Sequence, residues 1–290
     1  MDTIYTIYKD EYPFLLQQIN DPPEKLYVRG QLPKLNAKVL CVVGARRHSS
    51  YGKEACEKLI SGLRGENICI VSGMALGIDS LAHRSAMEAG LQTIAFPGSG
   101  LDQRVLYPYK NKKLAEEIVE KGGALISEYE MMHPAELWTF PRRNRLMAGI
   151  SDATLVIEAE EKSGTLITSR LALGYFRDVG TVPGPIFSPL SEGPNNLIAD
   201  GAKMIRDSND ILELLDLRLK ENEEIKRQNN LFSELNSNEK KILGLLKVEP
   251  HTNEQLIDKS DLSAREINGL ISSLEIQDLI ESASGKFKIK

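Results

Sequence analysis

Three arginines within four positions form the most distinctive candidate site in the sequence. They belong to the segment WTFPRRNR, in which Pro141 suits the first position of a helix. Arg142 and Arg145 are three residues apart and share one helix face, and no acidic residue follows before Asp152. Arginines that bind phosphates, beside aromatic faces that stack on bases, suit a single-stranded nucleic acid. The candidates are Phe140, Arg142, Arg143, Asn144 and Arg145. A solvated basic face beside core aromatics is the alternative interpretation.

The second candidate is the turn after the first predicted buried strand, which reads VVGAR. Gly44 before a helix lets backbone N–H groups approach an anion, and Arg46 adds a fork that can hold phosphate. The segment is not GxGxxG, and the next strand ends in Ser72 and Gly73, not in the acid that binds a dinucleotide ribose. An ordinary tight turn with a surface arginine is the alternative.

Two further turns resemble anion-binding helix starts. The segment PGSGLD follows the third predicted strand, and Lys162, Ser163, Gly164 and Thr165 open a helix after the fifth. Because the carboxyl ends of parallel strands meet at one edge of a sheet, we expect these turns to share one crevice.

A nucleotide-binding or nucleotide-hydrolysing enzyme using the same crevice is the competing hypothesis. Nucleotide-cleaving relatives of the Rossmann class can carry PGGxGTxxE at this helix start, but Thr168 stands here where they have the glutamate. The sequence contains no P-loop, HExxH or Ser-His-Asp order. Asp79 and His83 are four residues apart on one predicted helix, where Asp79 suits the helix dipole better than catalysis. We therefore expect no catalytic residues.

Alternating strands and helices must position these residues. Predicted strands are 39–43, 68–71, 93–96, 124–127, 154–157 and 179–182, and helices near 52–64, 78–89, 111–121, 142–149 and 165–176 lie between them. Strands that are apolar throughout belong to a parallel sheet covered on both faces. The prediction is an α/β fold, an extended Rossmann-like doubly wound parallel sheet. A helix and a strand before it, within 1–37, should pack on this sheet.

The composition changes after Ile205. An amphipathic helix is expected over 208–217, capped by Ser208 or Asn209, and a polar linker without apolar periodicity follows. Helices over 237–246, 252–257 and 263–274, then a hairpin over 280–289, predict a C-terminal winged-helix domain. Its third helix carries Arg265 as its one base, so we expect protein contact first and duplex binding second. Predicted domain ranges are 1–37, 38–217, 218–233 (linker) and 234–290.

The overall charge excludes binding through bulk positivity. The 290 residues contain 36 Lys and Arg and 41 Asp and Glu, a net charge of −5, so an anion site must be a local cluster. The three cysteines have no CxxC spacing, which argues against a disulfide framework or a structural zinc and predicts no metal. No secretory signal or membrane-length apolar stretch is visible, which predicts a cytoplasmic location.

Taken together, these motifs resemble those of the DprA/Smf family, the DNA-processing protein A of bacteria. The segments that carry the resemblance are VVGARRHSSYG (42–52), SGMALGIDSLAH (72–83), PGSGLD (97–102), FPRRNRLMAG (140–149), SGTLITSRLAL (163–173) and VPG (182–184). Lys162 departs from the pattern, since arginine is common there. Many members begin with an extra helical domain, which we expect to be absent here.

The resemblance implies a non-enzymatic protein without a cofactor. It implies binding of single-stranded DNA, formation of homodimers, protection of incoming DNA, and loading of RecA recombinase during natural transformation and recombination. By motif position, it places DNA contacts on Arg46, Phe140, residues 142–145 and residues 163–165. The full set of predicted DNA-binding residues is Gly44, Arg46, Ser72, Gly73, Phe140, Arg142, Arg143, Asn144, Arg145, Lys162, Ser163, Gly164 and Thr165.

Overall fold

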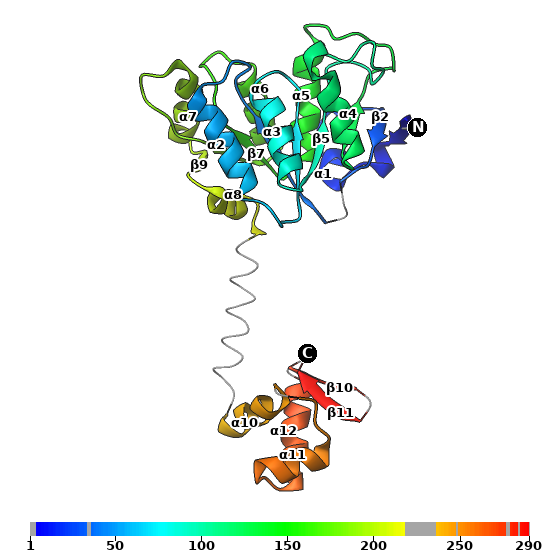
Figure 1. The fold of residues 1–290 in the computed structure, drawn as a ribbon, viewed down its shortest axis with the longest axis vertical. Helices are drawn as coiled ribbons and strands as arrows, with labels where there is room; N and C mark the ends of the chain where they lie inside the picture. Colours follow the sequence, from blue (N-terminus) through cyan, green and yellow to red (C-terminus); the bar gives the residue numbers. More distant parts are fainter. Residues whose placement is uncertain are drawn as a thin grey trace. The chain divides into compact units, whose positions relative to one another are not determined.

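The computed structural model of the protein divides into two units, Met1–Arg218 and Leu219–Lys290 (Figure 1). The structure describes residues 4–33, 36–217, 236–247, 249–276, 279–283 and 285–289. The predicted linker 218–233 and the tip of the predicted hairpin at Ser284 lie outside these residues. Each unit is described by itself.

One mixed sheet organises the first unit. In the described part of the chain, nine strands pair in the order β1-β2-β6-β5-β4-β3-β7-β8-β9. All neighbours from β6 to β9 are parallel. The strands are β1 (Ile4–Tyr8), β2 (Lys25–Gly30), β3 (Lys38–Val43), β4 (Ile68–Ser72), β5 (Gln92–Ala95), β6 (Ala124–Ser127), β7 (Ala153–Val156), β8 (Asp178–Thr181) and β9 (Lys203–Met204). The predicted doubly wound, mostly parallel sheet is confirmed.

The N-terminal segment joins this sheet and does not simply lie on it. β1 pairs antiparallel with β2, and β2 pairs antiparallel with β6, with Tyr27 opposite Ser127. A short 3-10 helix, η1 (Lys9–Glu11), and helix α1 (Phe14–Gln17) connect β1 and β2. Leu16 of α1 belongs to the same hydrophobic core as Leu146 and Ile150, which lie in one helix that covers the sheet, α5 (Thr139–Ile150). The segment thus extends the sheet and contributes one covering turn.

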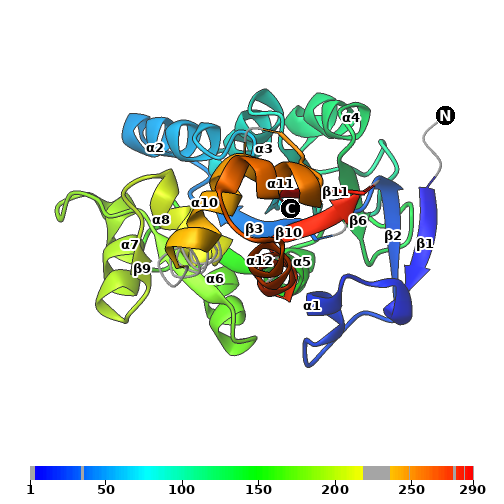
Figure 2. The same ribbon diagram turned by 90° about the horizontal axis from the view of Figure 1, so that it is seen from below.

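Helices cover both faces of the sheet, as Figure 2 shows. Leu40 and Val42 of β3 face the core formed with helices α2 (Ser50–Ser61), α3 (Ile78–Glu88) and α8 (Ser208–Leu214). Cys41 and Val43 face the core formed with α1 and α5 (Thr139–Ile150). Because successive strand residues point to opposite faces, β3 is apolar at nearly every position. This double burial explains the unbroken apolar runs in the sequence.

The remaining helices of the first unit differ in how visible they are in the sequence. Two predicted helical segments are observed as helices. They correspond to η2 (Tyr109–Asn111) with α4 (Lys112–Glu120), and to α6 (Thr165–Gly174). α7 (Pro189–Ala199) was not predicted, because it contains Pro194 in its interior. We predicted Ser208 or Asn209 as the N-terminal cap of α8, and this is wrong. The cap is Asp207, whose carboxylate accepts hydrogen bonds from the N–H groups of Asn209 and Asp210.

The second unit is a winged helix. It contains α10 (Ser237–Leu246), α11 (Asn253–Ser260), α12 (Ala264–Ile276) and the antiparallel strands β10 (Ile280–Ala283) and β11 (Lys286–Ile289). Its own core includes Leu256, Ile267 and Leu274. The capping box at the start of α11 joins Thr252 and Gln255, as the sequence spacing predicts.

Candidate nucleic-acid interface

A cleft of about 510 Å³ lies beyond the carboxyl ends of the parallel strands. The chain leaves β3 toward β4 on one side, and β7 pairs with β3 on the other, so the cleft occupies the position where ligands bind in open α/β sheets. It brings together the predicted residues Gly44, Arg46, Phe140, Arg143, Asn144, Ser163, Gly164 and Thr165. It is not lined by Ser72, Gly73, Arg142, Arg145 or Lys162.

Two turns of the cleft are tied together by their own side chains. Thr165 Oγ1 donates a hydrogen bond to the carbonyl of Gly44 at 3.1 Å, and the N–H of Thr165 donates to Ser163 Oγ at 3.2 Å. Gly44 is held against Ile78, because a Cβ built on it would lie 2.6 Å from that side chain. A Cβ on Gly164 would meet nothing within 4 Å, so there is open space beside the start of α6.

The start of α2, in contrast, already holds an anion that belongs to the protein. The buried carboxylate of Glu158 accepts hydrogen bonds from the N–H (2.9 Å) and the hydroxyl of Ser49. Ser49 Oγ in turn accepts from the N–H of Gly52 at 3.0 Å. A Cβ on Gly52 would lie 2.2 Å from Glu158 Oε2. The position at this helix start where we expected a phosphate is therefore occupied by Glu158, and the predicted phosphate contact of that turn depends on Arg46 alone.

Arg143 forms the floor of the cleft and is not a surface cation. Its side chain is buried, and Nη1 donates to the carbonyls of Gly73 (2.5 Å) and Phe96. Burial lowers the pKa of Arg143, and the nearby Asp79 opposes that shift. A Cβ on Gly73 would lie 2.6 Å from Nη1 of Arg143. Gly73 thus makes room for the guanidinium, which links the ends of two strands.

Asp79 and Asn144 complete this floor. Asp79 is buried and accepts from the N–H groups of Gly73 at 3.2 Å and Ala75 at 3.4 Å. Desolvation raises the pKa of its carboxyl, and Arg143 lowers it. Asn144 Oδ1 accepts from Arg143 Nε at 3.2 Å. Asp79, Arg143 and Asn144 thus form an interacting polar group within the cleft lining.

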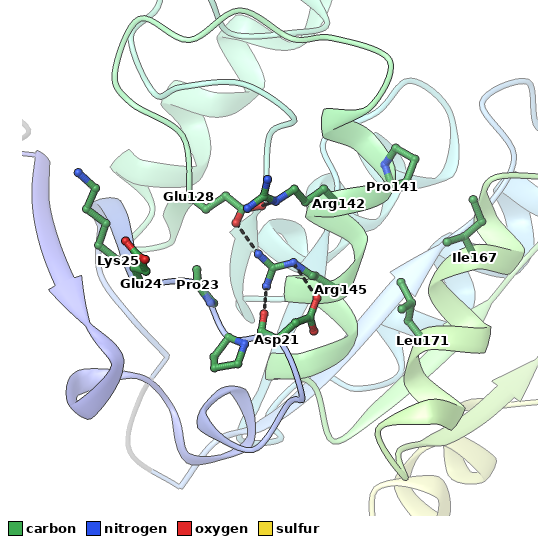
Figure 3. Close-up of a pocket in the computed structure, with 11 residues that line it drawn as sticks. Asp21, Pro23, Glu24, Lys25, Glu128, Pro141, Arg142, Arg145, Ile167 and Leu171 are labelled. Atoms are coloured by element: carbon green, nitrogen blue, oxygen red, sulfur yellow. Dashed lines mark hydrogen bonds and ion pairs between the residues drawn. The ribbon is translucent and has the colours of Figure 1, made fainter.

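Arg142 and Arg145 share a face, as the spacing predicts, but that face borders a second cavity (Figure 3). Arg145 is buried and pairs with Glu128 and with Asp21, at 3.4 Å to the latter's carboxylate. Arg142 is exposed, and its Nε lies 3.3 Å from Glu128 Oε1. Burial raises the pKa of Glu128, and both arginines oppose that shift. The arginines are therefore not unopposed, because Glu128 and Asp21 pair with Arg142 and Arg145 and Asp79 lies near Arg143.

Ser72 and Lys162 lie apart from the cleft lining for different reasons. Ser72 is buried, and its hydroxyl donates to the carbonyl of Val42 at 2.6 Å. That bond joins the ends of β4 and β3. Lys162 is exposed in the turn before α6, where it adds positive charge beside the open helix start.

An aromatic and cationic cluster lies at the mouth of the cleft. The guanidinium carbon of Arg46 is 5.6 Å from the centroid of the Phe140 ring, and the Tyr107 ring is 5.7 Å from it on a tilted plane. Gly98 supports Phe140 from below, since a Cβ there would lie 2.6 Å from the ring. Tyr107 was missed in the sequence, although an aromatic residue before a proline in a strand-exit loop was a usable signal.

His83 and the cysteines take no part in the cleft chemistry. His83 is buried with Nδ1 2.7 Å from Thr93 Oγ1, and burial lowers its pKa to about 3. Cys41, Cys56 and Cys69 are buried, unpaired thiols. Among the described residues, no group of three or more potential metal-ligating side chains is found.

The sequence profile described as "DNA recombination-mediator protein A" matches residues 3–216. The chain belongs to this family. A second profile, "DprA winged helix domain", matches residues 232–286, in agreement with the fold of the second unit.

Curated members of the DNA recombination-mediator protein A family resemble the chain over its first unit. Protein Smf of Escherichia coli is 41% identical over 208 residues, which make up 72% of this chain and 55% of that protein. The chain thus spans little more than half of that relative's length. DNA processing protein DprA of Streptococcus pneumoniae is 40% identical over 208 residues, 72% of each chain.

Two solved structures of the family are similar to this one. The X-ray structure of DprA from Streptococcus pneumoniae matches with a TM-score of 0.68 and 39% identity, covering 73% of this chain and 74% of that one. DNA processing protein A from Helicobacter pylori, whose structure was described for its single-stranded DNA binding mode, matches with a TM-score of 0.66 and 30% identity. The match covers 76% of this chain and 99% of that one.

Within the described ranges, no helix is both long and apolar enough to cross a bilayer.

Proposed function

We propose that this protein binds single-stranded DNA, with the backbone in the cleft at the β3 and β7 strand ends. The observation that carries the proposal is the contact between Arg46 and Phe140, a cation of the kind that binds phosphates and a ring of the kind that stacks on bases, at one mouth of the cleft. The exposed Lys162, in the turn before α6, adds positive charge, and the open space beside Gly164 leaves room for a backbone. The single-stranded DNA binding mode described for the Helicobacter pylori relative supports the same ligand class.

The proposed role is that of a mediator without a catalytic step. It protects incoming DNA and loads RecA recombinase on it during natural transformation and recombination, and it acts as a homodimer. Membership of a family described as recombination mediators supports this role. Co-sedimentation with RecA on single-stranded DNA, and sedimentation equilibrium of the protein alone, test the two partners separately.

A comparison of single-stranded and duplex oligonucleotides tests the ligand. We expect tighter binding of the single strand and a linear fall of log affinity with log salt, with a slope of about −0.7 for each neutralised phosphate. Equal affinity for both forms contradicts the proposal.

A nucleotide-binding or nucleotide-hydrolysing enzyme is the second candidate, because the cleft also contains carboxylates. Glu160 is exposed at its rim, whereas Asp79 is buried among backbone N–H groups. Thr168, at the position where nucleotide-cleaving relatives have glutamate, is buried. Incubation with nucleoside monophosphates distinguishes the two, since sustained turnover supports the enzyme and overturns the mediator.

A further inference from the structure

A mostly apolar groove, distinct from the cavity that Arg142 and Arg145 border, adjoins the mouth of the cleft. Its volume is about 510 Å³, and it is lined by Tyr107, Ala135, Glu136, Leu137, Trp138 and Phe140. Leu137 is 90% exposed, and Tyr107 and Trp138 are each 48% exposed. Single exposed apolar residues are ordinary, but side chains of this size gathered in one groove mark a binding surface.

The lining of this groove suits a nucleobase and disfavours a phosphate. It contains no Lys or Arg, and its one charged side chain is the carboxylate of Glu136. That carboxylate accepts from the indole N–H of Trp138 at 2.9 Å, so the polar edge of the indole is satisfied within the protein. A phosphate would meet a negative charge here, whereas a flat aromatic base would meet apolar rings.

The indole is held in place before any ligand arrives. Trp138 makes edge contacts with the rings of Tyr129 and His133, each with a centroid distance of 5.7 Å. Tyr129 is buried, and its hydroxyl donates to the carbonyl of Thr139 at 3.3 Å. A ring positioned in this way loses little conformational freedom when a base stacks on it.

The groove is continuous with the cleft, because Leu137 and Phe140 line both. Phe140 lines both, with Arg46 over its ring on the cleft side and Tyr107 beside it on the groove side. A strand whose phosphate is held by Arg46 therefore lies next to the groove that Tyr107 and Trp138 line.

We propose that this groove takes an unpaired base of the strand whose backbone lies in the cleft. The inference rests on the proposed function and deepens it, because it assigns the selection of single strands to one surface. In a duplex, paired bases are stacked on their neighbours inside the helix and must be unstacked before they can enter the groove. The groove thus recognises unpaired bases through their faces and without sequence preference.

Trp138 is the only tryptophan of the chain, so its fluorescence reports on the groove directly. The test compares an oligo-dT strand with a strand of equal length in which the central nucleotides are abasic. Binding is followed by the anisotropy of an end label, and indole emission is read at saturation of each strand. We expect quenching by oligo-dT and recovery of most of the emission with the abasic strand, because a stacked base quenches an indole.

Variants extend the test to affinity. Tyr107→Ser should weaken oligo-dT binding at least about fivefold, the equivalent of roughly 1 kcal/mol of lost stacking, and leave the abasic strand unaffected. Tyr109→Ser is the matched control, because Tyr109 is 77% exposed, lies two positions away and does not line the groove. Thermal melting confirms that each variant is folded.

The outcomes separate the two proposals. Anisotropy that shows strand binding, with equal indole emission for the two strands, overturns the groove assignment and leaves the cleft as the DNA site. A loss of affinity in Tyr107→Ser that is the same for both strands also overturns it. The absence of strand binding by the wild-type protein contradicts the proposed function itself.

Discussion

The guanidinium of Arg46 lies over the ring of Phe140, 5.6 Å from its centroid. The two residues come from the loop after β3 and from the first turn of α5, and the sheet brings these segments together at its carboxyl edge. The contact occupies one face of the ring in the free protein. A base that stacks on this face must displace the guanidinium, which is then free to bind a phosphate.

This relationship predicts strong coupling between the two side chains. Phe140→Ala should cost roughly 1–3 kcal/mol of strand affinity, because one stacking surface is lost. Arg46→Ala should weaken binding of all sequences alike, because it removes a phosphate contact. The double variant should lose more than the two single losses added, because each single variant already avoids the cost of breaking the Arg46–Phe140 contact. A double-mutant cycle by fluorescence anisotropy measures this difference. Strict additivity contradicts the coupling, and a Phe140→Ala protein that melts at much lower temperature assigns the ring to the core.

Arg142 and Arg145 should behave differently although they are three residues apart. Arg142 is exposed, so Arg142→Ala should weaken oligo-dT and mixed sequences equally and reduce the salt slope by about 0.7. Arg145 is buried with Glu128, so Arg145→Ala should cost roughly 3 kcal/mol of folding stability by leaving a buried carboxylate short of a partner. Urea unfolding and salt-dependent binding of both variants check this. Unchanged affinity in Arg142→Ala removes that residue from the site.

Removal of residues 220–290 should leave single-strand binding largely intact. The cleft and its neighbouring groove belong to the first unit, which has cores of its own. Circular dichroism and anisotropy of the truncated protein measure the effect. A folded product that binds more than about tenfold more weakly, ~1.4 kcal/mol, places the winged helix in the DNA site.

His83 should make the first unit less stable in mild acid. Burial lowers its pKa from 6.5 to about 3, so between these values the unfolded chain takes up a proton that the folded one does not. The free energy of unfolding is therefore highest above pH 6.5. As the pH falls below this value, His83 lowers it by up to about 1.4 kcal/mol per pH unit.

The control for this effect is His83→Asn, which keeps a donor near Thr93 and cannot titrate. Burial raises the pKa of Asp79 and of Glu128, and these groups act with the opposite sign, but they are present in both proteins. Urea unfolding between pH 7.5 and 4.5 should therefore show a shallower loss of stability in the variant. Parallel profiles contradict the assignment.

Local patterns were sufficient for most of the secondary structure. The capping box of Thr252 and Gln255 and the Ser263–Glu266 pair are observed where the spacing predicts them. β1 was missed although its residues, IYTIY, are β-branched or aromatic. α7 was missed because propensity disfavours a helix with Pro194 inside it.

The electrostatics of the site depended on contacts that no local window contains. The arginine cluster lacks neighbouring acids in sequence, yet Asp21 and Glu128 approach it through the fold. The same holds for Glu158, which reaches the start of α2 from the end of β7. The sequence shows where the arginines are clustered. The fold determines which of them are exposed to solvent, because it buries Arg143 and Arg145 and leaves Arg142 exposed.

The two flanks of the sheet differ in how readily they can accept a further strand. Among the strands that the structure describes, β9 is two residues long and offers little backbone to pair with, whereas β1 is five residues long and stands at the end of the strand order with Tyr5 and Tyr8 exposed. Polymers of strands grow from long, open edges. Fibre-like association of this protein would therefore start at β1, the flank farther from the cleft in the strand order, and assemblies grown there would keep their clefts accessible.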